Sequence, residues 1–351
     1  MRRIVSMMFL MALAFNCFSQ GNRWSEEKAK QWYQSSVWFS GINYIPSDAI
    51  NYTAMWDKTS FNPALIDKEL AIAQSIGFNC VRVTLQHAVY ADDPQYFIYA
   101  FDRFLDICDK HGIRVMPCFF DDCAFGVNAD PVVGKQVELL EGWYSWGWSP
   151  SPGHTMVIDQ RLHPLLERYV KDMMLRFRND QRIFIWDLYN EPTNGNVGLH
   201  SLPLVKSVFA WAREINPAQP ITIAVWNNNK ELNDIVIENS DIISFHHYGS
   251  KDETEKFIQR LRQYNRPIIC SEWMNRLVKS TVEEIMPLLK KENVGSMLWG
   301  LVNGKTQTNL PWEFRPEKLP YTGEWQHDLY GSDFKPYKIR EIETIRKLNG
   351  K

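Results

Sequence analysis

Short apolar runs alternate with amphipathic stretches along the chain from about residue 37 onward. Most of these runs are continuous rather than alternating, which is typical of parallel strands that are buried on both faces. Eight runs are predicted as strands, at residues 37–44, 80–85, 113–120, 183–189, 221–226, 242–247, 267–271 and 296–301.

Helical patterns fill the intervals between these strands. Asn62 and Pro63 form a good cap and first turn for one helix. Gly112 closes a second helix, predicted over residues 95–111. Further helices are predicted at residues 160–178, 202–215, 232–237, 253–264, 281–291 and 337–348.

This alternation predicts an α/β fold, a single (β/α)8 TIM barrel over residues 20–351. A doubly wound open sheet is the competing fold, but no glycine-rich phosphate loop follows any predicted strand. The longest irregular stretches, residues 121–159 and 303–335, follow the third and eighth strands. A barrel builds its active site at the C-terminal ends of its strands, so these stretches are expected to frame the site.

The N-terminus is expected to be an export signal, a cleaved signal peptide over residues 1–19. Arg2 and Arg3 precede an apolar run, residues 4–15, that is too short to span a bilayer. This predicts a secreted or periplasmic protein without a membrane span, and a lipid anchor at Cys17 is the alternative. The net charge of −2 gives no sign of a nucleic-acid partner, and the pattern leaves the oligomeric state open.

Five cysteines follow Cys17, at none of the spacings of a zinc site. A disulfide between Cys118 and Cys123 is an alternative to the favoured interpretation, in which the thiols are free and pack as small hydrophobes. The 14 Trp residues fit core packing, and they are also side chains that stack on sugar rings.

Two glutamates follow predicted strands on the same rim of the barrel. Glu191 lies in the segment Asn190-Glu191-Pro192 after strand four, and Glu272 follows strand seven. Either segment alone is weak evidence, because such loops are common. Their joint placement favours a retaining glycosidase, which needs two carboxyl groups about 5–5.5 Å apart. We therefore expect Glu191 and Glu272 to be the two catalytic carboxyl groups.

Several motifs occur in order around this pair, and together they resemble clan A glycoside hydrolases. The closest resemblance is to the cellulase-like or xylanase-like bacterial members of glycoside hydrolase family 5. The resemblance implies that Glu191 is the acid/base and Glu272 the nucleophile, and it covers nearly all of the mature chain. It rests on Gly77-Phe-Asn-Cys-Val-Arg82, Asn190-Glu191, Phe245-His246-His247-Tyr248, Glu272, Trp299 and the stretch from Trp325 to Tyr337.

The resemblance also implies that Arg82 lies near the nucleophile, that His246 and Tyr248 line the site, and that Trp299 floors a sugar subsite. Structural alternatives are a buried ion pair for Arg82, a core position for His246 and barrel-mouth packing for Trp299. Asn190 is expected to bond a substrate 2-hydroxyl.

The third strand departs from the family pattern, which places a histidine near its end. Asp122 stands close to that position, either as a sugar ligand or as a cap of the long loop. Within that loop Trp148 belongs either to a sugar-stacking platform or to a hydrophobic mini-core. Lys305 and Gln307, just beyond strand eight, are candidate contacts for a polar or acidic substituent.

The sequence thus predicts a retaining glycoside hydrolase that acts on a β-linked oligo- or polysaccharide of plant or microbial origin, with no cofactor and no metal. One alternative is a carbohydrate-binding barrel without activity, which the presence of both glutamates disfavours. The other is a metal-dependent hydrolase that uses His246 and His247. Adjacent strand residues point to opposite faces, so these two are poorly placed to bind one metal.

Overall fold

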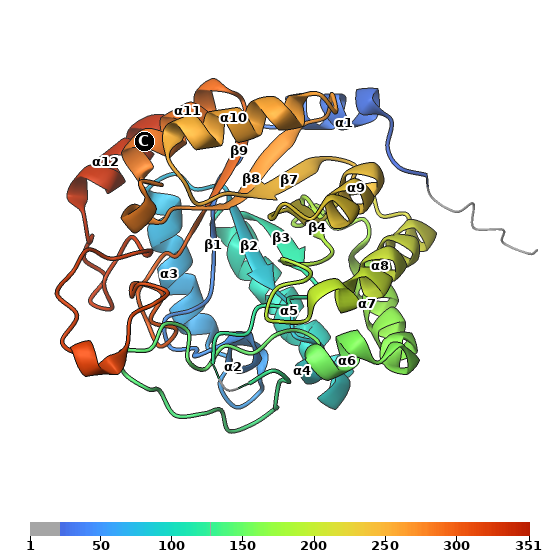
Figure 1. The fold of residues 1–351 in the computed structure, drawn as a ribbon, viewed down its shortest axis with the longest axis horizontal. Coiled ribbons are helices and arrows are strands. Elements are labelled where there is room, and N and C mark those ends of the chain that lie inside the picture. Colours follow the sequence, from blue (N-terminus) through green and yellow to red (C-terminus); the bar gives the residue numbers. More distant parts are fainter. Residues whose placement is uncertain (1–21, 127) are drawn as a thin grey trace, which may run out of the picture.

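A computed structural model of the chain describes residues 22–126 and 128–351 (Figure 1). The predicted signal peptide and Cys17 lie outside these described residues. Within them, no helix combines the length and the apolar character needed to cross a membrane.

One parallel sheet of nine strands forms the centre of the fold, in the order β5-β4-β3-β2-β1-β9-β8-β7-β6. The strands are β1 (Ser40–Asn43), β2 (Cys80–Thr84), β3 (Arg114–Cys118), β4 (Trp186–Asp187), β5 (Ile221–Thr222), β6 (Ala224–Val225), β7 (Ile243–His246), β8 (Ile268–Trp273) and β9 (Gly295–Trp299).

The edge strands β5 and β6 are two halves of the single strand predicted at residues 221–226, interrupted only at Ile223. The Asp241 backbone N–H, at the entry to β7, donates to the Ile221 carbonyl at 2.9 Å, which brings the two ends of the sheet together. The sheet is therefore an eight-stranded barrel, and the prediction of a single (β/α)8 fold is confirmed.

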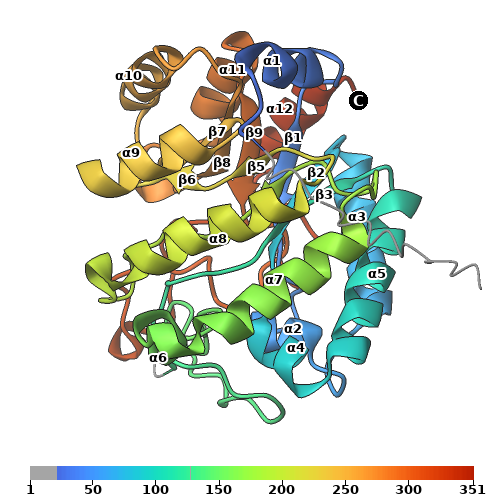
Figure 2. The same cartoon turned by 90° about the vertical axis from the view of Figure 1, so that its right-hand side faces the viewer.

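Helices surround the sheet, and those predicted from the sequence are present with small shifts at their ends (Figures 1 and 2). The α-helices are α1 (Glu26–Gln34), α2 (Tyr52–Trp56), α3 (Pro63–Ser75), α4 (His87–Asp92), α5 (Pro94–Lys110), α6 (His154–Ile158), α7 (His163–Phe177), α8 (Leu202–Ile215), α9 (Lys230–Asn239), α10 (Lys251–Arg262), α11 (Val282–Lys291) and α12 (Ile339–Asn349). Four of them, α1, α2, α4 and α6, were not predicted. Three of these are single turns of five or six residues, too short to show a helical period.

Helix α1 closes the N-terminal end of the barrel. Trp24, just before the helix, and Tyr33, in its last turn, pack with Phe39, Phe184 and Met297 in a cluster separate from the main core. Burying each such aromatic side chain contributes about 1.5–3 kcal/mol. The end of the barrel opposite the predicted active site is therefore sealed by the chain's own first helix.

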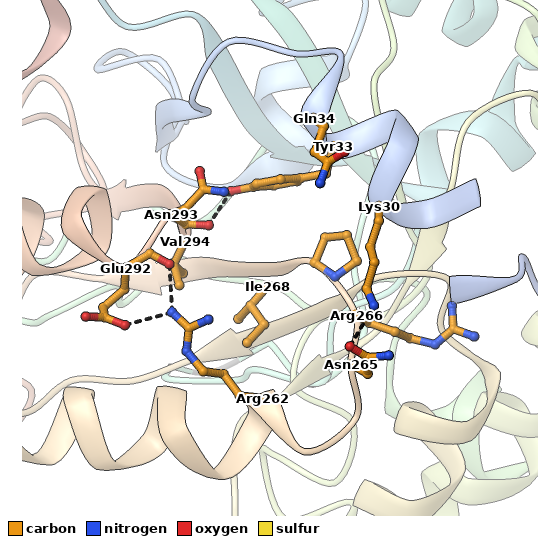
Figure 3. A pocket seen from close by; sticks show the side chains of 11 residues that line it. Lys30, Tyr33, Gln34, Arg262, Asn265, Arg266, Ile268, Glu292, Asn293 and Val294 are labelled. Atoms are coloured by element: carbon orange, nitrogen blue, oxygen red, sulfur yellow. Dashed lines mark hydrogen bonds and ion pairs between the residues drawn. The ribbon is translucent and has the colours of Figure 1, made fainter. Parts of the chain in front are cut away.

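The seam between α1 and the barrel contains a cavity of roughly 300 Å³ (Figure 3). Its polar groups already have partners. Tyr33 donates to the Asn293 carbonyl at 3.1 Å, and Lys30 Nζ donates to Asn265 at 2.6 Å. Arg262 pairs with Glu292 at 2.7 Å. The first two contacts attach α1 to the barrel, and the third joins the end of α10 to the residue after α11.

At the other end, the loops at residues 121–159 and 303–335 join into one structure, which we call the loop wall. The Gln307 side chain accepts from the Gly142 N–H at 2.9 Å and donates to the Leu140 and Trp143 carbonyls at 2.8 and 3.0 Å. Tyr144 packs on Leu310 across the same junction. Both views place these loops on the side of the molecule away from α1 (Figures 1 and 2).

The loop wall rests on the short segments that follow β1 and β2. The Asn51 amide donates to the Gly147 carbonyl at 2.7 Å, and the Gln86 amide donates to the Pro150 carbonyl at 3.2 Å. The loop wall follows β3 and β9 in the chain and covers the ends of β1 and β2. It therefore closes the half of the rim formed by β9, β1, β2 and β3. The opening of the barrel faces the ends of β4 to β8.

Candidate active site

Glu191 and Glu272 meet at this opening. One carboxylate oxygen of each and a ring nitrogen of His246 all lie within 4.8 Å of one another. Glu272 belongs to β8, and Glu191 begins the turn that follows β4. The two acids predicted from separate strands therefore form one pair.

Glu191 has a backbone φ of 44°, in the left-handed region that side chains other than glycine rarely adopt. Asp122 holds the turn in this conformation. It accepts from the Tyr189 hydroxyl at 2.7 Å and from the Thr193 N–H at 2.8 Å, and the Ser201 hydroxyl is a third donor. A strained backbone held by buried hydrogen bonds is typical of functional sites.

Arg82 is buried below the pair and bonds to four polar side chains. Its guanidinium contacts Asp187 at 2.7 Å and Glu272 at 2.6 Å. It also donates to the side-chain oxygens of Asn43 at 2.9 Å and Asn190 at 2.7 Å. Burial opposes its charge, but Asp187 and Glu272 raise the Arg82 pKa above its ordinary value. The guanidinium therefore stays charged and orients Glu272.

Glu272 has two strong donors. Besides Arg82, the Tyr248 hydroxyl donates to its second carboxylate oxygen at 2.8 Å. Burial raises the Glu272 pKa, and Arg82 and the Tyr248 hydrogen bond oppose that rise. His246 lies 3.6 Å away, but burial lowers its pKa to about 4, so the ring is neutral at neutral pH. Arg82 is thus the cation that favours ionised Glu272.

Glu191 has weaker, neutral partners. One oxygen contacts His246 Nδ1 at 2.8 Å, and the other accepts from the Asn194 amide at 2.6 Å and the Cys123 thiol at 3.4 Å. Burial raises the Glu191 pKa as well. No cation touches Glu191 among the described residues, so its protonated form is favoured relative to that of Glu272.

A cavity of roughly 410 Å³ opens over the pair and is lined mainly by aromatic side chains. Trp148 of the loop wall and Trp299 of β9 lie with ring centroids 5.9 Å apart. The lining residues are Cys123, Phe125, Tyr144, Trp148, Asn190, Glu191, Asn194, Trp226, His246, His247, Tyr248, Glu272, Trp299 and Trp312.

Most of the predicted site residues are brought together here. Asn190, His246, Tyr248, Trp299 and Trp148 line the cavity with the two glutamates, and Arg82 lies beneath them.

Three predicted ligands lie elsewhere, and one of them, Gln307, is occupied by the bonds that join the two loops. Asp122 is fully buried, and its side chain bonds Tyr189, Thr193 and Ser201 around the Glu191 turn rather than the cavity or the long loop. Its neighbour Asp121 faces the other way and bonds Asn190 and Trp148, because consecutive residues of an extended segment point to opposite sides. Lys305 lines a separate depression with Asp48, since its backbone bonds Ser47 and turns it away from the cavity.

Sequence reasoning missed several contributors from the loops. Asn194 and Cys123 both contact Glu191, and Trp226 and Trp312 line the cavity. Only Asn194 carried a usable signal, since it lies three residues after Glu191 in the same turn. Outside the loops, Asp187, which pairs with Arg82, had a signal too, because it is a charged residue within the otherwise apolar strand run at residues 183–189.

Two open questions of the sequence concern cysteines and metals. All five described cysteines are free, so Cys118 and Cys123 form no disulfide. Glu191, His246 and Glu272 have the spacing to hold a cation, whereas His247 is not part of that cluster. His247 instead packs its ring on Phe257 at 5.3 Å.

Comparison with known proteins agrees with this fold. The exo-beta-1,4-mannosidase Op5Man5 from Opitutaceae bacterium strain TAV5 superimposes with a TM-score of 0.61 at 16% identity, over 90% of this chain and 59% of that one. A GH5_18 protein from Bifidobacterium longum subsp. longum gives 0.63 at 13% identity, over 90% and 78%. The beta-glucuronidase of Faecalibacterium prausnitzii gives 0.54 at 16% identity, over 90% and 49%.

The chain thus spans about three fifths of the mannosidase and about half of the glucuronidase. At these identities the likeness concerns the fold. No curated protein matches the sequence. A family model does match, over residues 59–335, and its description is glycosyl hydrolases family 2, TIM barrel domain. That span covers most of the barrel and both glutamates, and it confirms the resemblance to clan A. The chain belongs to this TIM-barrel family of glycosyl hydrolases.

Proposed function

We propose that the protein is a retaining β-glycosidase in which Glu272 is the nucleophile and Glu191 the acid/base. The observation that carries the proposal is the pair itself, with carboxylate oxygens within 4.8 Å and different partners. Retaining enzymes hold their carboxyl groups about 5–5.5 Å apart, whereas inverting enzymes separate them by about 6.5–9.5 Å to admit a water.

In the first step Glu272 attacks the anomeric carbon while Glu191 gives its proton to the glycosidic oxygen. The bond from that carbon to the leaving oxygen breaks, and a covalent glycosyl-enzyme forms. Arg82 and Tyr248 favour the ionised, correctly oriented nucleophile. The raised pKa of Glu191 keeps a proton available for the leaving group.

In the second step Glu191, now a carboxylate, removes a proton from water, and the water oxygen displaces Glu272 from the anomeric carbon. The Asn194 amide at 2.6 Å stabilises the carboxylate in this stage. Asn190 lines the cavity beside both acids, with its oxygen held by Arg82 and its amide donating to Asp121 at 2.7 Å. We assign the second N–H of that amide to the substrate 2-hydroxyl.

The substrate in this proposal is a β-linked oligo- or polysaccharide of plant or microbial origin. The aromatic lining supports it, because the C–H faces of pyranose rings pack on such side chains. One related structure is named as a β-1,4-mannosidase, and another contains Manb1-4GlcNAc. β-Mannosides are therefore the first members of a test panel. The proposal also includes export, secreted or periplasmic, which rests on residues 1–19 and is tested by fractionating cells.

The test compares wild type, Glu272→Ala and Glu191→Ala on aryl β-glycosides, with and without azide. The exposed Glu138 supplies a matched control, Glu138→Ala, which should keep full activity. Azide should rescue Glu272→Ala with formation of the α-glycosyl azide, since it attacks directly. It should rescue Glu191→Ala with the β-glycosyl azide, since it intercepts the glycosyl-enzyme. Undiminished hydrolysis by Glu272→Ala, or the opposite anomers, would show the assignment to be wrong.

A further inference from the structure

The cavity differs from a general sugar site in the charge of its lining. Among the described residues that line it, the charged side chains are Glu191 and Glu272, and both are acids. The two histidines add no positive charge near neutral pH, because burial lowers the His246 pKa to about 4 and the His247 pKa below its ordinary value. Within residues 22–126 and 128–351, no lysine or arginine lines the cavity.

The cations nearest to the cavity already have partners. Arg82 is shared among Asp187, Glu272 and two asparagines. Arg276 pairs with Glu341 at 2.6 Å and donates to backbone carbonyls. Arg315, on the loop wall, lies over the Trp143 ring at 5.0 Å. Lys305 lies in the separate depression.

The loop wall determines where a substrate charge would lie. The sugar that Glu272 attacks must sit on the Glu272 side of the pair, and there the neighbours are aromatic. Trp312 contacts Tyr248 at 5.4 Å, and Trp148 contacts Trp299 at 5.9 Å. Phe125 continues this surface, 6.1 Å from Trp148. These aromatic side chains and the two acids line the cavity around that sugar, so a substituent on it exchanges part of its water shell for their surfaces.

We infer that the site hydrolyses uncharged glycosides and rejects uronides and other anionic sugars. This inference rests on the proposed function and specifies its substrate class. A carboxylate on the bound sugar would be desolvated between two acids and an aromatic wall, with no cation to pair with it. A neutral hydroxymethyl group in the same place carries no such penalty. The fold itself permits either substrate class, so the selection comes from this chain's lining.

The test uses matched aryl β-glycosides that differ only at C6, the glucoside with the glucuronide and the galactoside with the galacturonide. We expect kcat/KM for the neutral member to exceed that for the uronide by roughly 100-fold or more. A uronide hydrolysed as fast as its neutral counterpart would overturn the inference. If Glu272-dependent hydrolysis is found with no glycoside, the proposed function fails instead. The charge inference is then decided by calorimetric binding of neutral and uronic-acid-terminated disaccharides, and equal affinities would overturn it.

A variant that adds a positive charge tests whether the lack of a cation in the cavity causes the rejection of uronides. Phe125 is 44% exposed at the cavity edge, so Phe125→Arg places a guanidinium there without disturbing the core. The ratio of uronide to neutral kcat/KM should rise by about 3-fold to 10-fold, and the gain should shrink in high salt. Tyr99, an exposed aromatic on α5, gives the matched control Tyr99→Arg, in which the ratio should not change. An unchanged ratio in folded Phe125→Arg would refute the charge argument.

Discussion

Removing the Tyr248 hydroxyl tests how the nucleophile is kept ionised. In Tyr248→Phe, Glu272 loses the donor that lies 2.8 Å from one of its oxygens but keeps Arg82 on the other. This hydrogen bond favours the carboxylate, so its loss raises the Glu272 pKa further. The acidic limb of the kcat/KM profile, below which Glu272 is protonated, should therefore move to higher pH.

The size of the effect follows from the type of bond. A hydrogen bond to a charged group contributes about 1.5–3 kcal/mol, and each 1.36 kcal/mol corresponds to a factor of about 10. At a pH below the limb, activity is proportional to the ionised fraction, so kcat/KM should fall by about 10-fold or more. Above the limb the carboxylate forms in both proteins, and the loss should be smaller.

The assay is the pH dependence of kcat/KM on an aryl β-glycoside. Tyr33→Phe is a matched control, because it removes a hydroxyl that bonds the Asn293 carbonyl at the sealed end of the barrel. It should lower stability by about 1 kcal/mol and leave the profile unchanged. An acidic limb that stays in place, or moves to lower pH, in Tyr248→Phe would contradict the assigned role of Tyr248.

Three further predictions concern metal, the loop wall and pH. A chelator should leave hydrolysis unchanged, and loss of activity in chelator would instead support the metal-dependent alternative. Added Zn²⁺ should inhibit hydrolysis, because Glu191, His246 and Glu272 can bind a cation. Gln307→Ala removes three hydrogen bonds between the two loops and should lower the free energy of unfolding by about 1–3 kcal/mol. Limited proteolysis within residues 121–159 should also be faster, and an unchanged cleavage rate would contradict the joint wall. Burial raises the Asp328 pKa from 3.8 to about 7, so the fold favours the protonated form, and stability falls as the pH rises from about 4 to about 7, because the unfolded chain loses this proton first. Asp328→Asn should flatten that fall in a series of melting temperatures across this range, and an unaltered slope would assign it to other groups.

The barrel was predictable because its strands are buried on both faces and read as continuous apolar runs. The predicted strand at residues 183–189 nevertheless contracts to Trp186–Asp187, since only these residues pair regularly and Ile183 makes an isolated bridge. Strand ends also place Glu191 and Glu272 correctly, because a parallel barrel brings all C-terminal ends to one rim.

The loops were not predictable in the same way, because their course depends on contacts between distant segments. Lys305 follows strand eight closely in sequence, yet its bond to Ser47 carries it away from the cavity. Cys123 is a free, buried thiol as expected, but its contact with Glu191 was not predictable, since it depends on the Asp121 backbone, which pairs with Ser151 and Asn190 and fixes the start of its loop. No periodicity in the sequence encodes such pairings.

The seating of α1 has a consequence for the order in which the molecule can assemble. The helix is the first described element of the chain, yet its partners come from the far end. Arg23 donates to the Ser240 carbonyl, the Trp24 N–H donates to Asp241, and Tyr33 donates to Asn293, just before β9. These contacts span more than 200 residues, the kind of long-range closure that slows folding. During synthesis the helix has no binding site until the last strand emerges, so barrel closure and N-terminal docking should complete together, as a single late event.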